Sequence, residues 1–175
     1  MQAPQNLFEL RYVPEKAGIY IVFWIKDGKP IPIPRILATC NRGVLYIGSS
    51  NKLRERLNAL KISIEIARGK RRRKNYPHTF GPSLIYTRLI EKISDNELYV
   101  WFKPFEDYED QYKHQEMLAL HEYTRKYGEP PPLNLQVGRE YFAIVGIGKF
   151  GKSRLAPELD PEIKEVLSLE NTDKA

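Results

Sequence analysis

Three residues in the first third of the chain could carry out chemistry on a phosphate ester. Tyr20 ends a Gly-Ile-Tyr tripeptide, Tyr46 begins a Tyr-Ile-Gly tripeptide, and Arg56 follows ten residues after Tyr46. An arginine offers a planar set of donors to phosphate oxygens and keeps its charge. Two phenols could position or deprotonate a water molecule, provided that a neighbouring cation lowers a tyrosine pKa from near 10. Taken singly, each residue also has an ordinary structural role, in strand packing or on a solvated helix.

The elements that would position these residues follow from the local pattern. A β-branched and aromatic run predicts a strand over 18–26, and a second short strand is predicted over 44–48. We expect the two strands to pair in antiparallel fashion. Apolar residues then recur at helical spacing from Leu53 to Ile64, which predicts a helix that ends near Gly69 and carries Arg56 in its first turns.

The rest of the chain supplies further elements. A third strand is predicted over 98–102, and a long amphipathic helix over 107–127 is followed by Gly128 and three prolines. The segment 30–34 alternates proline with isoleucine, which fits an extended edge or a loop because proline donates no ladder hydrogen bond. The segment 75–82 is predicted as a loop, and 83–92 fits either a helix or a strand.

Beyond the long helix, the pattern predicts a last short strand over 141–145. A final short helix is expected to begin at Pro161 with Asp160 as its cap. We predict an α/β (α+β) fold with a small, mainly antiparallel three-stranded central sheet flanked by helices. The chain of 175 residues is predicted to form a single domain, with a core at about 17–134 and a C-terminal extension over 135–175.

The composition excludes several classes of protein. The longest apolar run has seven residues, Ile19 to Ile25, whereas a membrane-spanning helix needs about 20. The first fifteen residues contain charged side chains and no apolar segment, so we expect no signal peptide. The single cysteine, Cys40, excludes an intrachain disulfide and fits a reducing compartment. We therefore expect a cytoplasmic (intracellular) protein without membrane contacts.

The net charge of +6 is unevenly distributed. The segment 52–74 carries a net charge of +8, and the rest of the chain sums to −2. A local excess of this kind is typical of a surface that binds nucleic acid, although a solvated helix end and loop would have the same composition. The candidate DNA-binding residues are Lys52, Arg54, Lys70, Arg71, Arg72, Arg73 and Lys74.

The two tripeptides resemble the motifs of the GIY-YIG nuclease family, which is named after them. Both occur here letter for letter and in order, with 26 residues from tyrosine to tyrosine. In this family an arginine lies ten residues beyond the second tyrosine, which corresponds to Arg56. The resemblance covers about residues 17–134. It departs from the family where Ser49 and Ser50 replace a lysine or threonine that often follows the second tripeptide, and where Leu60 replaces a histidine found in some members.

The resemblance also implies the remaining site residues. The family has a metal-binding glutamate on a later helix, then a proline-containing turn and an asparagine. The order of residues matches Glu122 and Asn134, which we select, and Glu116 is the alternative metal ligand. His78 could replace the missing histidine, but a structural or exposed histidine fits the sequence equally well.

From this resemblance we expect a metal-dependent endonuclease that hydrolyses DNA phosphodiester bonds. Glu122 would hold Mg²⁺ (or Mn²⁺), which favours oxygen ligands and acts as a Lewis acid. A homodimer would allow both strands to be cut. The alternative is a catalytically inactive or accessory nucleic-acid-binding module of the same fold.

A competing motif lies near the end of the chain. Residues 146–153 read Gly-Ile-Gly-Lys-Phe-Gly-Lys-Ser, which matches the P-loop pattern and also G-x-G-x-x-G. A P-loop requires a helix immediately afterwards and further strands. Only 22 residues follow, and Pro157 interrupts the first turns of that helix. We therefore disfavour nucleotide binding.

Overall fold

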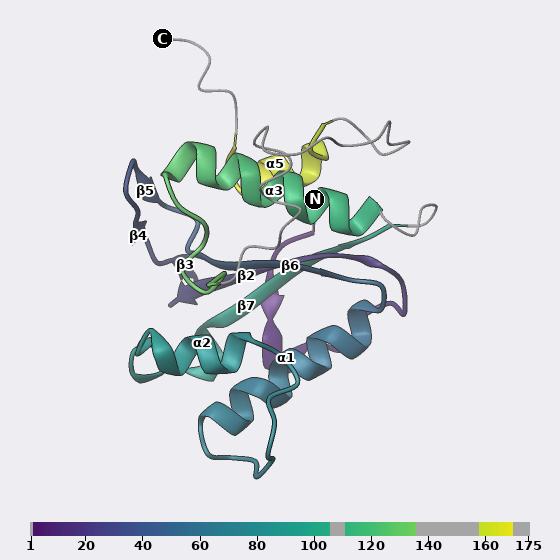
Figure 1. The fold of residues 1–175 in the computed structure, drawn as a ribbon, viewed down its shortest axis with the longest axis vertical. Helices are drawn as coiled ribbons and strands as arrows, with labels where there is room; N and C mark the ends of the chain where they lie inside the picture. The colour runs from purple at the N-terminus through teal and green to yellow at the C-terminus, as the bar shows by residue number, and fades with distance from the viewer. Residues whose placement is uncertain (1, 106–110, 136–157, 170–175) are drawn as a thin grey trace.

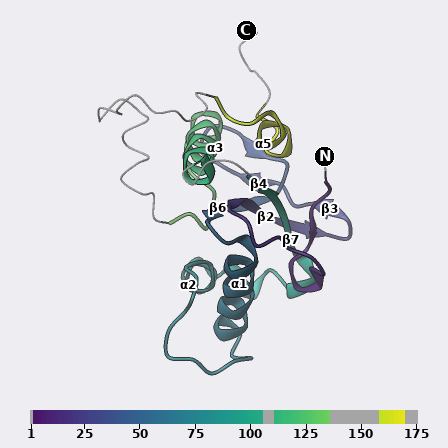
Figure 2. The same ribbon diagram turned by 90° about the vertical axis from the view of Figure 1, so that its right-hand side faces the viewer.

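The computed structural model describes residues 2–105, 111–135 and 158–169 (Figure 1). The fold is mixed α+β, with an antiparallel sheet between two layers of helices. Helices α3 and α5 cover one face of the sheet, and α1 and α2 cover the other (Figures 1 and 2). The predicted class, an antiparallel sheet flanked by helices, is confirmed. The predicted strand over 141–145 and the motif over 146–153 lie outside the described residues.

The sheet is built around its longest strand, β2 (Gly18–Lys26). It pairs in antiparallel fashion with β6 (Val44–Ser50) on one side and with β7 (Leu98–Pro104) on the other. These are the three strands that the sequence predicts. Two short strands enlarge the sheet to five: β1 (Gln5–Asn6) pairs with β7, and β3 (Lys29–Pro30) pairs with the end of β2.

The proline-rich segment contributes only very short strands, in accord with its lack of ladder donors. Outside the main sheet, β4 (Ile33–Pro34) and β5 (Thr39–Cys40) form a separate two-stranded pair. Three 3₁₀ turns complete the irregular segments of the described chain. They are Leu7–Glu9, Leu89–Glu91 and Asp95–Glu97.

The described residues contain four α-helices. Helix α1 (Leu53–Ala67) buries the predicted stripe of leucines and isoleucine, and α3 (Gln111–Tyr127) matches the described part of the predicted long helix. Helix α2 (Phe80–Tyr86) begins inside the segment that we predicted as a loop. Helix α5 (Pro161–Val166) begins as predicted. Within the described ranges, no helix has the length and apolar character needed to cross a membrane.

Two separate hydrophobic cores result from the alternation of side chains along β2. Ile19, Ile21 and Phe23 face α3 and α5, whereas Tyr20 and Val22 face α1 and α2. Because successive side chains of a strand point to opposite faces, a strand covered on both sides must be apolar throughout. The continuous apolar run of β2 is therefore explained by its central position.

A β-bulge in β6 determines where Tyr46 points. Val22 pairs with Tyr46 and Phe23 pairs with Val44, so Leu45 has no partner on β2. The extra residue interrupts the alternation. As a result, Leu45 and Tyr46 both face the core beneath α1 and α2, the core that also contains Tyr20.

Candidate active site

The two tyrosines lie side by side on neighbouring strands, as the sequence predicts. Tyr20 pairs with Gly48, and Tyr46 pairs with Val22, so the two tyrosines are diagonal neighbours across β2 and β6. Their ring centroids are 6.0 Å apart and the rings are stacked at 23°. Tyr20 is fully buried, whereas Tyr46 retains 8% of its accessible surface. Of the two side chains, only that of Tyr46 has any accessible surface left.

The side chains of Tyr20 and Tyr46 leave no room for a side chain at position 48, so this position requires glycine. A Cβ atom at this position would lie 2.6 Å from the hydroxyl oxygen of Tyr20 and 2.6 Å from Cε1 of Tyr46. Contacts this short force neighbouring atoms to move. The glycine of the second tripeptide thus leaves the space that the tyrosine side chains occupy.

His78 joins this pair from the loop between α1 and α2. Its Nε2 atom lies 2.7 Å from the Tyr20 oxygen, and its Nδ1 atom accepts a hydrogen bond from the backbone N–H of Phe80 at 3.0 Å. A neutral imidazole carries one proton, and the nitrogen that accepts from Phe80 cannot carry it. The proton is therefore on Nε2, and His78 donates to Tyr20.

Close packing between α1 and α2 fixes His78 in place. The Ser63 hydroxyl on α1 donates to the backbone oxygen of His78. A Cβ atom at Gly81 would lie 2.3 Å from the Ser63 backbone oxygen, so only glycine allows α2 to approach α1 this closely. The side chain of His78 is 2% exposed.

Arg56 lies over the tyrosine hydroxyls from the first turn of α1. Its Nε atom is 3.3 Å from the Tyr20 oxygen, and its charge also acts on Tyr46. The side chain is half-buried. Arg56 therefore combines an interaction with both phenols and partial access to a ligand from solvent.

The electrostatics of the site keep its aromatic groups neutral. Burial raises the pKa of Tyr20 well above its ordinary value, and burial followed by the Glu116 carboxylate raises the pKa of Tyr46. Arg56 lowers both pKa values, in the expected direction, but burial outweighs it. Burial, with a smaller effect of Arg56, lowers the pKa of His78 to about 3.

Several neighbouring groups act on the pKa of Tyr46. Tyr20 accepts hydrogen bonds from His78 and Arg56, so its own proton is free for another acceptor. Arg56, Thr79 and Tyr20 each act to lower the pKa of Tyr46, against the larger effect of burial. Thr79 was not among the residues singled out from the sequence, because its contact depends on how the loop before α2 folds back.

The two candidate glutamates lie in different surroundings. Glu122, our choice from the sequence, forms an ion pair with Arg125 at 2.9 Å, and no contact among the described residues links it to either tyrosine. Glu116 accepts a hydrogen bond from the hydroxyl of Ser49, the residue after the second tripeptide, and its charge acts on both tyrosines. The structure therefore favours Glu116, the alternative, as the carboxylate of this site.

A signal for Glu116 is present in the sequence. Tyr112, Ala119, Leu120 and Tyr123 are buried residues of α3, and Glu116 lies at i+4, i−3, i−4 and i−7 from them. A carboxylate on the apolar face of an amphipathic helix is unusual unless it has a partner or a function. Helical periodicity could therefore have distinguished Glu116 from Glu122.

Asn134 orders the outer edge of β6. Its side chain accepts a hydrogen bond from the Ile47 N–H at 2.9 Å and donates to the Ile47 oxygen at 2.7 Å. The backbone N–H of Leu133 donates to the oxygen of Leu45. Asn134 is buried, and it supports the strand between Tyr46 and Gly48 through these contacts.

Four of the seven candidate DNA-binding residues are engaged in ion pairs. Lys52 pairs with Glu55, Arg54 with Glu15, Lys70 with Asp95 and Arg71 with Glu65. The other three have no acidic partner among the described residues and are exposed. These unpaired cations are Arg72, Arg73 and Lys74.

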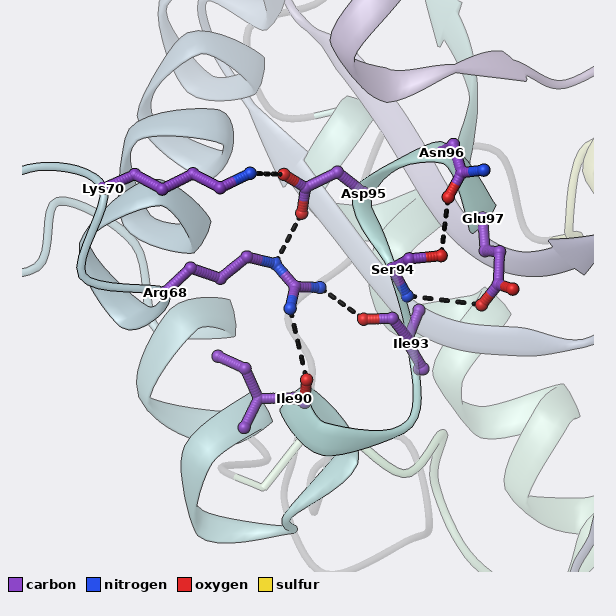
Figure 3. A network of polar contacts seen from close by, with 8 residues as sticks. All are labelled: Arg68, Lys70, Ile90, Ile93, Ser94, Asp95, Asn96 and Glu97. Carbon is purple, nitrogen blue, oxygen red and sulfur yellow. Dashed lines mark hydrogen bonds and ion pairs between the residues drawn. The ribbon is translucent and has the colours of Figure 1, made fainter.

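The basic loop, as we name residues 70–74 between α1 and α2, begins at a polar network centred on Asp95 (Figure 3). The Asp95 carboxylate accepts from Nε of Arg68 at 2.5 Å and from Nζ of Lys70 at 2.6 Å. The same Arg68 side chain donates to the backbone oxygens of Ile90 and Ile93. The loop is therefore held at its start by Asp95 and at its end by His78.

The described residues contain no group of three or more histidine, cysteine or acidic side chains that could hold a metal ion. Comparison of the chain with protein-family models, with curated proteins and with solved structures gives no match.

Proposed function

We propose that this protein is a metal-dependent endonuclease that hydrolyses DNA phosphodiester bonds with a site of the GIY-YIG type. The observation that carries the proposal is the convergence of Tyr46, Arg56 and Glu116 around one end of β6. These groups are, respectively, an acceptor for a water proton, a phosphate ligand and a hard oxygen ligand. Tyr46 comes from β6, Arg56 from α1 and Glu116 from α3, so the arrangement depends on the packing of these three elements.

Tyr46 is the group that would contact the attacking water. It is the tyrosine that retains accessible surface, and Arg56, Thr79 and Tyr20 all act to lower its pKa. Donors directed at an oxygen favour its deprotonated form. Tyr20 and His78 are buried behind it and act as positioning residues.

Glu116 would hold the divalent cation. Magnesium is commonly bound through one or two carboxylates together with water and substrate phosphate, so a single carboxylate with neighbouring hydroxyl groups fits it. The bound cation would act as a Lewis acid at the leaving oxygen and would cancel the charge through which Glu116 raises the pKa of Tyr46.

Arg56 and the basic loop would bind the DNA backbone. The guanidinium of Arg56 would take the scissile phosphate in two parallel hydrogen bonds. Along α1, a rise of 1.5 Å per residue separates Arg56 from Arg68 by about 18 Å, or roughly five steps of 3.4 Å along one DNA strand. Arg72, Arg73 and Lys74 would therefore contact phosphates several nucleotides from the cleaved bond.

The proposal is tested by the rate at which the protein converts supercoiled plasmid to the nicked form in Mg²⁺. Arg56→Lys is the variant, and Arg125→Lys is the matched control. We expect wild-type protein and the control to nick the plasmid. Arg56→Lys should be at least ~100-fold slower, because a point charge replaces the planar fork. Wild-type protein that binds plasmid without cutting it in Mg²⁺ or Mn²⁺ would instead identify a nucleic-acid-binding module.

A further inference from the structure

A pocket opens beside the tyrosine pair and shares Tyr46 with it. The Tyr86 pocket, as we name it, has a volume of about 290 Å³. This is close to the lower end of the range of about 300–1,000 Å³ for small-molecule sites. Its walls come from β6, from α2 and the residue before it, and from the segment after the three prolines. Among its lining residues are Tyr46, Thr79, Ser83, Tyr86, Leu133 and Leu135.

The Tyr86 pocket combines polar and apolar lining groups. Tyr46, which is 8% exposed, and the exposed Thr79 supply hydroxyl groups. Tyr86 is 81% exposed and Leu135 is 49% exposed, so both offer apolar surface to a ligand. Ser83, a residue of α2 that is 5% exposed, adds another hydroxyl group to the lining. Flat apolar faces with polar groups at the edge are the features of a site for an aromatic heterocycle.

The lining of the Tyr86 pocket is uncharged, and a cation lies at the neighbouring site. None of its lining residues is acidic or basic, and the pocket shares Tyr46 with the site that contains Arg56. A ligand with an uncharged ring in the pocket and an anionic group at Arg56 would fit both. An aromatic ring attached to a phosphate describes a nucleotide. We propose that the Tyr86 pocket receives a nucleobase next to the phosphate bound by Arg56, stacked on the ring of Tyr86; this inference rests on the proposed function.

The bound base must be unstacked from its neighbours. In a duplex both faces of a base are covered by adjacent base pairs, so Tyr86 can stack only on a base that has left the helix or lies in a single strand. The substrate class that follows is DNA with an unpaired nucleotide next to the cleaved bond. Fully paired DNA would have to pay the additional free energy of unstacking.

Binding measured in EDTA tests the Tyr86 pocket without cleavage. The probes are two DNA duplexes of the same length, one fully paired and one with a single unpaired 2-aminopurine nucleotide at its centre. We expect wild-type protein to bind the second duplex roughly tenfold more tightly and to quench its 2-aminopurine fluorescence. Tyr86→Ala should lose most of this preference, and Tyr86→Phe should keep it. Tyr12→Ala, which removes another exposed tyrosine outside the pocket, should match wild-type protein.

Equal affinity of wild-type protein for both duplexes would overturn the inference, as would a preference that survives in Tyr86→Ala. The experiment also separates this inference from the proposed function. A Tyr86-dependent preference without cleavage in Mg²⁺ would support the pocket and contradict the nuclease. Equal cleavage by wild-type protein and Tyr86→Ala, with no preference in binding, would support the nuclease and contradict the pocket. Failure to bind either duplex would contradict both.

Discussion

The backbone N–H of Phe80 donates to Nδ1 of His78 at 3.0 Å, and this contact places the imidazole proton on the side of Tyr20. A backbone amide can only donate, so the direction of this hydrogen bond is fixed. His78 therefore donates to Tyr20. Both residues, buried behind Tyr46, keep their protons in the neutral site, so neither acts as a base there.

The pH dependence of stability should report the burial of His78. Its folded pKa, about 3, lies below the unfolded value near 6.5, so the unfolded state binds more protons between these pH values. The contribution of His78 to stability is therefore complete above pH 6.5 and is lost as pH falls. From pH 5.5 to 4.5, wild-type protein should lose about 1.4 kcal/mol more than His78→Gln in urea unfolding. Parallel pH curves would contradict a buried neutral imidazole.

Replacement of Gly48 by alanine should disturb both tyrosines. The added Cβ would meet the Tyr20 hydroxyl and the Tyr46 ring at 2.6 Å, and overpacking of this kind costs roughly 1–3 kcal/mol. We expect a lower midpoint of urea unfolding and slower plasmid cleavage. Unchanged stability in Gly48→Ala would show that the rings do not pack against this glycine.

Asp95 should contribute more to stability than an exposed acidic residue in the same region. Asp95→Asn removes the charge that pairs with Arg68, whose side chain is 16% exposed, and should cost about 1–2 kcal/mol. Glu91→Gln is the matched control, because Glu91 pairs with the exposed Arg88 and such pairs contribute less than about 1 kcal/mol. Equal losses in the two variants would contradict a structural role for the network around Asp95.

The unpaired cations of the basic loop should determine the salt dependence of DNA binding. Replacing Arg72, Arg73 and Lys74 together by serine should reduce the slope of log affinity against log salt by up to about 2.7, or about 0.9 for each phosphate contact. The control replaces Lys26, Lys29 and Arg125 by serine, which changes the net charge equally elsewhere. If both triple variants change the slope equally, binding depends on net charge and not on this loop.

Much of the frame that holds the site could be predicted from local pattern. The apolar run of β2 and the helical spacing of α1 are strong signals, and together they place Tyr20, Tyr46 and Arg56 near one another. The bulge at Leu45 could not be predicted, because it is defined only by the pairing of β6 with β2. The same holds for His78, which reaches Tyr20 across 58 residues of sequence through a loop held by Ser63.

The two candidate glutamates differ in a property that order along the sequence does not contain. The order along the chain, a glutamate on a helix followed by a proline-containing turn and an asparagine, favours Glu122. Position on the helix surface, however, decides which carboxylate reaches the sheet. Glu116 lies among buried residues of α3, whereas Glu122 pairs with Arg125. A pattern that counts residues along the chain does not contain this information.

Cleavage of supercoiled plasmid in Mg²⁺ by Glu116→Gln and Glu122→Gln tests which of the two carboxylates binds the metal ion of the proposed nuclease. Both variants replace a carboxylate on α3 by its amide, so they differ only in the position of the lost charge. We expect Glu116→Gln to lose at least ~100-fold in rate, since the metal ligand is removed, and Glu122→Gln to cleave like wild-type protein. Full activity in Glu116→Gln, or loss of activity in Glu122→Gln alone, would show that Glu116 is not the metal ligand.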